Sequence, residues 1–157
     1  MQQRSRRGLS LLAVIATVSA FALLGCVGDK EHDNPATASD LNNRAFTFPS
    51  GKVFDPALTN VPTVLAFANN ATTFALHATV QNLVHTATGT YGAGTGSCRL
   101  PIGNSLDPNA SSGGSDFPTG TGPQPGKTIN LVICDFDRTK NTLTVFDGTT
   151  TLTGVPQ

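Results

Sequence analysis

The chain has 157 residues, and its 10 Lys and Arg side chains balance its 10 Asp and Glu side chains, so the formal net charge is zero. This length suits one domain that buries a single hydrophobic core. Nucleic-acid binding and a polybasic membrane-surface role both require a cluster of Lys and Arg residues. No such cluster follows the first seven residues. We therefore expect no nucleic-acid partner.

The N-terminal segment has the order of an export signal. Three arginines within the first seven residues are followed by the apolar run Leu9–Leu24 and by Gly25-Cys26. The run is 16 residues long, shorter than the roughly 20 that span a bilayer as a helix. This favours a processed signal over a transmembrane anchor. General secretion is the favoured export route, with the twin-arginine route as the alternative because Arg6 and Arg7 are paired.

Residues Leu23-Leu24-Gly25-Cys26 resemble the lipobox of bacterial lipoproteins. In that family the cysteine thiol carries a diacylglyceryl group, the chain is cut before it, and the new amino terminus is acylated. The resemblance implies a signal peptide at 1–25, lipidation of Cys26 and the lipid bilayer as a partner. With Val27 after the cysteine, it also implies an exported protein at the outer rather than the inner membrane, facing the periplasm or the cell surface.

Removal of residues 1–25 leaves 132 residues with a net charge of about −3. Residues 26–40 are polar, contain Pro35 and follow neither the helical nor the strand period, so they indicate a flexible tether. The β domain is expected at 41–157, with a mobile loop at 103–126.

The cysteines support this division. If Cys26 carries lipid, Cys98 and Cys134 form an even pair in an oxidising compartment, and a disulfide is the natural prediction. Two buried free thiols are the alternative. A metal site is disfavoured because neither cysteine has a second Cys or a His at ligand spacing.

Short runs rich in Thr, Val, Ile and Phe, separated by Gly, Pro, Asn and Asp, predict an all-β fold. Eight strands are expected, at 44–48, 63–68, 72–80, 83–91, 97–102, 128–136, 142–146 and 149–154. They predict an antiparallel β-sandwich, with a small closed β-barrel as the alternative.

Three details of the strands can be predicted. Residues 128–136 are apolar enough on both faces for a central strand. A two-residue turn at Gln81-Asn82 would pair Val80 with Leu83. Asp147-Gly148 favours a two-residue type I′ hairpin between the last two strands.

The range 103–126 is rich in Gly, Ser and Pro and is longer than most connecting loops. Long loops are often functional. We expect Asp116 and Phe117 to present a contact surface at its tip.

The three histidines provide no catalytic constellation. His32 lies in the tether, His77 is expected to point to solvent, and His85 falls across from Ala78 on the other face. The two strand histidines then cannot share a metal, so we expect no metal and no other cofactor. Asp135-Phe-Asp137 with Asn141 indicates a hairpin turn rather than a calcium loop, because the glycine and distal glutamate of an EF-hand are missing.

The sequence therefore predicts a membrane-anchored cell-envelope lipoprotein without enzymatic activity, acting as a structural or interaction module with an envelope protein partner. A carrier of lipid or small ligands in a β-barrel is the second hypothesis. A hydrolase with an unrecognised site is the third.

Overall fold

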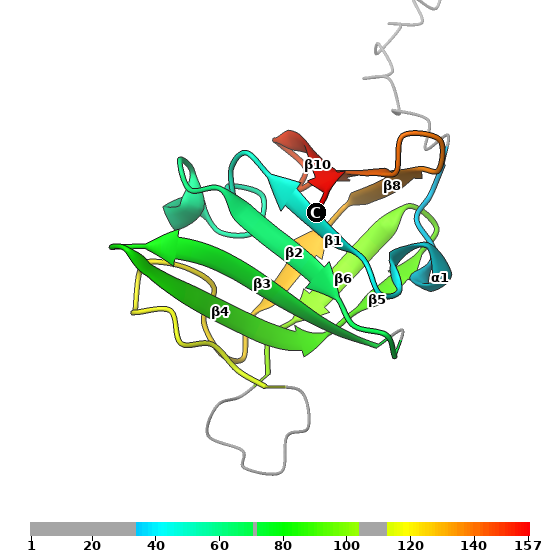
Figure 1. The fold of residues 1–157 in the computed structure, drawn as a ribbon. Helices are drawn as coiled ribbons and strands as arrows, with labels where there is room; N and C mark the ends of the chain where they lie inside the picture. Colours follow the sequence, from blue (N-terminus) through cyan, green and yellow to red (C-terminus); the bar gives the residue numbers. More distant parts are fainter. Residues whose placement is uncertain (1–33, 71, 104–112) are drawn as a thin grey trace, which may run out of the picture. The chain divides into compact units, whose positions relative to one another are not determined.

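Ten strands form two antiparallel sheets within the described residues, which are 34–70, 72–103 and 113–157 of a computed structural model (Figure 1). These residues belong to the second of two compact units into which the chain divides, His32–Gln157. The predicted signal peptide lies outside the described residues. Within them, no helix has the length and apolar character needed to cross a membrane.

The larger sheet has seven strands in the order β4-β3-β2-β1-β10-β9-β8, and the smaller sheet has the order β5-β6-β7. Their bounds are β1 Ala45–Phe48, β2 Thr63–Phe67, β3 Thr73–Val80, β4 Leu83–Thr90, β5 Gly92–Gly94, β6 Ser97–Pro101, β7 Thr128–Leu131, β8 Ile133–Asp137, β9 Thr142–Phe146 and β10 Thr151–Pro156. The two helices are short, α1 at Ala38–Leu41 and the 3-10 turn η1 at Pro56–Leu58.

This architecture confirms the predicted all-β sandwich, with ten strands instead of eight. Among the described residues each strand order ends in two edge strands, so the alternative closed barrel is not formed there. The additional strands are β5, within a glycine-rich stretch, and one that arises by division of the predicted strand 128–136.

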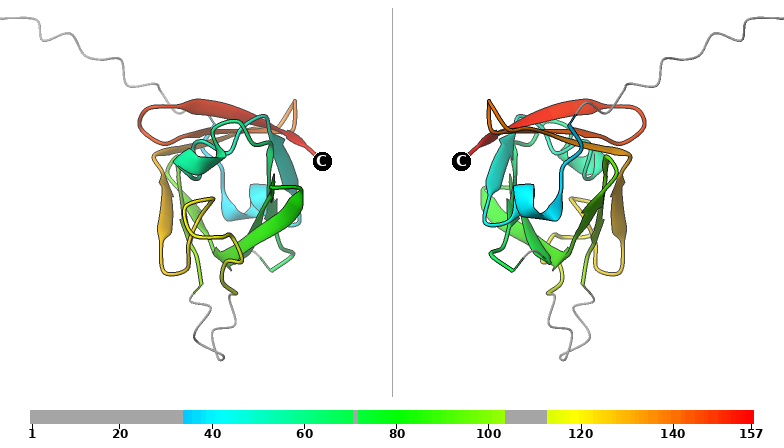
Figure 2. Two further views of the ribbon diagram at one scale, coloured as in Figure 1. Left: turned by 90° about the vertical axis from the view of Figure 1, so that its left-hand side faces the viewer. Right: turned by 90° about the vertical axis from the view of Figure 1, so that its right-hand side faces the viewer.

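The two sheets share one hydrophobic core because apolar residues alternate along the strands. On β3, Phe74, Leu76 and Ala78 are buried while the intervening side chains are only partly so, as the sequence predicts. The smaller sheet contributes Leu100 and Ile129, among others, to the same core. Figure 2 shows the strands surrounding this shared interior from two sides.

Aromatic rings fill much of the interior. Phe46 on β1 packs edge to face against Phe67 on β2, with ring centroids 6.4 Å apart, and against Phe136 on β8 at 6.0 Å. Phe67 in turn contacts Tyr91, at 4.7 Å. Edge-to-face pairs of this kind are favoured by the ring quadrupole and add to the hydrophobic contribution.

The turn between β3 and β4 is as the sequence predicts. Val80 pairs with Leu83, and Gln81 and Asn82 both have positive φ, 53° and 66°. Positive φ at both central positions defines a type I′ turn, whose twist matches that of the strands.

The turn between β9 and β10 differs from the prediction. Phe146 pairs with Thr151, so four residues separate the strands where two were expected. The carboxylate of Asp147 accepts hydrogen bonds from the amides of Thr149 (2.8 Å) and Thr150 (2.7 Å). An aspartate that bonds amides two and three residues ahead stabilises a wider turn, which competes with the type I′ geometry.

The prediction of a central strand at 128–136 is also wrong. The chain changes sheet at Val132, whose side chain is 55% exposed, so β7 ends one edge of the smaller sheet and β8 one edge of the larger sheet. The positions in the hydrophobic core are Ile129 and Leu131 before Val132 but Cys134 and Phe136 after it, so their parity changes where the chain changes sheet. In the sequence this change gives the appearance of one strand that is apolar on both faces.

On the opposite side the sheets approach at Gly89 of β4, which forms a bridge with Ile102. A Cβ atom at Gly89 would lie 1.9 Å from the carbonyl oxygen of Pro101. Only glycine permits this approach of two backbones.

Candidate functional site

Two of the residues singled out by the sequence, Cys26 and His32, lie outside the described residues. The lipidation of Cys26 therefore stays a prediction. The described chain begins at Asn34, the eighth residue after Cys26.

The boundary predicted between tether and domain is wrong, because residues 34–40 are part of the domain. The amide of Ala36 donates to the carbonyl of Cys134 (2.7 Å), and the amide of Phe136 donates to the carbonyl of Asn34 (2.8 Å). Ala36 is fully buried. These bonds cover the outer edge of β8, which would otherwise expose unpaired backbone groups.

Helix α1 follows directly and is held at both ends. Its N-cap Thr37 and Asp40 form a reciprocal capping box. The guanidinium of Arg138 makes two hydrogen bonds to the Asp40 carboxylate, at 3.1 and 2.6 Å. Burial raises the pKa of Asp40, but the bonds from Thr37 and Arg138 outweigh it, and the pKa lies below its usual value.

Sequence reasoning missed this cluster. The only local signal was Thr37-x-x-Asp40, a capping pattern without the apolar run that normally accompanies it. Arg138 lies 98 residues away from its partner, and no sequence pattern connects the two.

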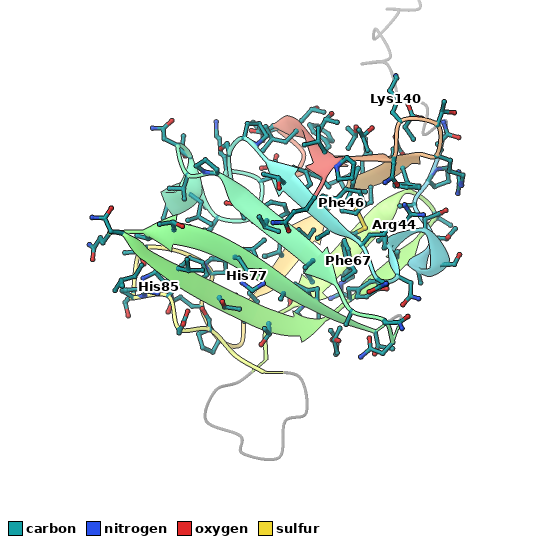
Figure 3. The ribbon with its side chains drawn as sticks, in the orientation of Figure 1. Arg44, Phe46, Phe67, His77, His85 and Lys140 are labelled. Atoms are coloured by element: carbon teal, nitrogen blue, oxygen red, sulfur yellow. A yellow bond between two sulfur atoms is a disulfide. The ribbon has the colours of Figure 1, made fainter. Side chains whose placement is uncertain are left out.

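A second cationic side chain lies nearby, at the start of β1. The guanidinium carbon of Arg44, which is labelled in Figure 3, lies 5.0 Å from the centre of the Phe136 ring. A guanidinium nitrogen of Arg44 donates a hydrogen bond to the side-chain oxygen of Asn141. Arg44 and Asn141 border a polar depression of about 340 Å³, which the C-terminal Gln157 also lines. Asn141 and the Phe136 ring both contact the Arg44 guanidinium, so this side chain is held in place at the border of the depression.

The predicted disulfide is present. Cys98 on β6 and Cys134 on β8 are bonded, buried and joined across the two sheets (yellow bond in Figure 3). The strands lie side by side, since the amide of Cys134 donates to the carbonyl of Gly96 at 2.7 Å. The bond therefore closes the sandwich at the point where the N-terminal segment is attached.

Asp116 and Phe117 are not at a loop tip, so this expectation is corrected. Phe117 is only 4% exposed and its ring lies 5.5 Å from that of His85. The carboxylate of Asp116 is exposed but accepts a 2.6 Å hydrogen bond from the amide of Thr86. The described part of the loop, from 113 onward, adds to the edge of β4, where the amide of Thr88 donates to the carbonyl of Gly114.

The histidines lie on opposite faces of the β3–β4 hairpin, as the predicted register requires (Figure 3). His77 forms a 3.0 Å hydrogen bond with the Thr86 hydroxyl. His85, opposite Ala78, places Nδ1 3.2 Å from the carbonyl oxygen of Asp116 and 3.6 Å from its carboxylate. This contact holds the 113–117 segment against β4.

Among the residues from 34 onward that the structure describes, no group of three His, Cys, Asp or Glu side chains is placed to hold a metal ion. The turn at Asp137 is a hairpin, as expected, and its carboxylate accepts from the amides of Thr139 and Lys140. The backbone hydrogen bond from Lys140 is the largest effect on the Asp137 carboxyl, whose pKa lies below its usual value.

No protein-family model, no curated protein sequence and no solved structure matches this chain. Its own geometry is therefore the ground for a functional interpretation.

Proposed function

We propose that this chain is an exported lipoprotein, held in a bacterial membrane by lipid on Cys26, and that its β-sandwich acts there as a structural or interaction module. The observation that carries the proposal is the Cys98–Cys134 disulfide. It accounts for two of the three cysteines, and Cys26, in the lipobox-like sequence, is the third.

The disulfide also bears on the compartment. Stable structural disulfides belong to oxidising environments, which proteins reach by export. The buried inter-sheet disulfide and the N-terminal sequence that resembles an export signal therefore support the same compartment.

The attachment of Asn34 to β8 limits the distance between domain and bilayer. Asn34 is the eighth residue after Cys26, and a fully extended chain advances at most about 3.6 Å per residue. Asn34, where the chain pairs with β8, would then lie within about 30 Å of the lipid surface. A module at that distance suits partners in or directly on the membrane.

The interior of the domain favours this function over the carrier hypothesis. Phe46 contacts both Phe67 and Phe136 where a ligand would have to lie. These side chains are buried and close-packed against both sheets, which is the arrangement of a structural core.

Metabolic labelling with an alkynyl fatty acid tests the anchor. We expect label on the wild-type chain expressed in a bacterium and no label on Cys26→Ser. A Cys98→Ser/Cys134→Ser double variant is the matched control and should keep the label, since it removes two thiols but not the proposed acceptor. An unlabelled wild type, or a labelled Cys26→Ser variant, would overturn the proposal.

A further inference from the structure

Strand β7 has an open edge. On one side it pairs with β6, with Leu100 opposite Ile129 and Pro101 opposite Thr128. Pro101 has no N–H, and the amide of Ile102 donates to the carbonyl of Lys127. In an antiparallel pair of strands, hydrogen-bonded and non-hydrogen-bonded residue pairs alternate. Because Ile102 bonds Lys127, the pairs at Thr128 and Asn130 are non-hydrogen-bonded, and the backbone N–H and C=O groups of these two residues point away from β6.

Nothing in the described chain pairs with that side of β7. The backbone N–H and C=O groups of Thr128 and Asn130 have no hydrogen-bond partner among the described residues, and both residues are exposed. The edge closes only at Val132, whose amide donates to Phe146 at 2.8 Å. Two successive outward positions thus offer the donor and acceptor spacing of a strand. In Figure 2 the gold-coloured chain of 128–137 follows one side of the domain.

The other long edges are covered. Residues 34–36 pair with β8, and residues 113–116 pair with β4. Covering or shortening edges is how β proteins avoid unwanted strand addition. The open edge of β7 therefore differs from both edges of the larger sheet, which are covered.

A groove of about 360 Å³ runs beside this edge. Its apolar wall includes Val53, Phe54 and Ile129, which are nearly buried, and Pro123. Side chains of an added strand alternate between two sides, so every second residue would reach this wall.

Three cationic residues form what we call the basic rim of the groove. Lys127 lines the groove itself, Lys52 precedes the lining residue Val53 in sequence, and Arg99 lies opposite the lining residue Asn130. All three cations are exposed, and none has a carboxylate partner among the described residues. Asp55 is the acidic residue of the groove lining, and its carboxylate is engaged, because it accepts from the amide of Ala57 and caps η1.

We propose that the open edge of β7 binds an extended, acidic segment of a partner protein by strand addition. This rests on the proposed function as an interaction module and names the class of its partner. The backbone of the segment pairs with Thr128 and Asn130, its apolar side chains enter the groove, and its carboxylates face the basic rim. Pairing with a second copy of β7 is disfavoured, because it would bring two sets of Arg99 and Lys127 together.

The probe is a fluorescein-labelled synthetic peptide of sequence Thr-Val-Asp-Val-Asp-Val-Thr, compared with Thr-Val-Lys-Val-Lys-Val-Thr. Fluorescence anisotropy is measured with the purified full chain in detergent. We expect the acidic peptide to bind at least about tenfold more tightly than the basic one. Equal binding of the two peptides, or binding of neither, would overturn the proposal.

Two variants test the backbone pairing. Asn130→Pro removes an outward N–H that the fold does not use, and should abolish binding, whereas Asn130→Ala keeps that N–H and should bind as wild type does. Full binding by a folded Asn130→Pro variant would contradict strand addition.

Hydrogen exchange on the wild-type chain keeps the test decisive if Asn130→Pro does not fold. The acidic peptide should slow exchange at the amides of Thr128 and Asn130, and unchanged exchange there would also overturn the proposal. These measurements do not depend on acylation. A failed peptide assay with successful fatty-acid labelling of Cys26 would therefore refute the binding site alone.

Discussion

The amide of Ala36 donates a 2.7 Å hydrogen bond to the carbonyl oxygen of Cys134, the residue whose side chain forms the inter-sheet disulfide. The N-terminal segment is thereby attached at the point where the two sheets are covalently joined. Pulling on the N-terminus, as a membrane anchor would, loads the most strongly connected part of the sandwich.

Removal of the disulfide should destabilise the domain strongly. The bond joins residues 36 apart in sequence, and the chain-entropy model gives about 3 to 4 kcal/mol for a loop of that size. A Cys98→Ala/Cys134→Ala variant should show this loss in urea unfolding. Reductant should then leave the variant unchanged while destabilising the wild type. A variant as stable as the oxidised wild type would contradict the role given to the bond.

Gly89→Ala should destabilise the sandwich by about 2 to 3 kcal/mol, because the new Cβ would lie 1.9 Å from the carbonyl oxygen of Pro101 and must push β4 from β6. Gly92→Ala is the matched control. A Cβ at Gly92 meets no atom within 4 Å, so its melting temperature should be close to that of the wild type. Equal effects of the two substitutions would show that the sheets do not approach at Gly89.

Phe117→Ala should cost about 3 to 4 kcal/mol, since the ring is buried beside His85. Leu83→Ala, on an apolar side chain that is 64% exposed, should change the unfolding free energy by less than about 0.5 kcal/mol. Hydrogen exchange gives a second measurement, in which Phe117→Ala accelerates exchange at Thr86 and Thr88. If Phe117 were at a mobile tip, as its sequence neighbours suggest, the two alanine variants would be equally mild.

The Asp40 carboxyl should make stability depend on pH. Its pKa is lower in the folded chain than its ordinary value of 3.8, so unfolding raises its affinity for protons. The stabilisation is fully present above about pH 4 and is lost as pH falls through the folded pKa. Because Arg138 is half exposed, Asp40→Asn should cost at most about 1 kcal/mol at pH 7 and progressively less below pH 3.8. A cost that stays constant down to pH 2 would exclude the ion pair with Arg138 as its source.

Local patterns account for the parts of the fold that the sequence predicts correctly. Alternation in 72–80 identifies the inward face of β3, and a two-residue turn at Gln81-Asn82 fixes the register of His85 against Ala78. Both features depend on neighbouring residues alone. The disulfide is predicted from the cysteine count together with the oxidising compartment that the lipobox-like segment implies, and neither requires a structure.

The errors arise where a segment is stabilised by a distant strand. Asn34 and Ala36 have no strand period, yet β8 binds them through backbone bonds that any sequence could make. The same holds for Gly114 and Asp116 on β4. From composition alone, these segments look like a tether and a loop. The sheet edges that bind them are formed by residues far away in the sequence.

The intact mass of the chain isolated from bacterial membranes tests the central claim most directly. Lipid attachment at Cys26 predicts a species that begins at Cys26 and carries the mass of a diacylglyceryl group and an amide-linked acyl chain. Reduction should add two hydrogens to it, from the Cys98–Cys134 disulfide. An unacylated chain, or one that begins at any residue other than Cys26, would contradict the account.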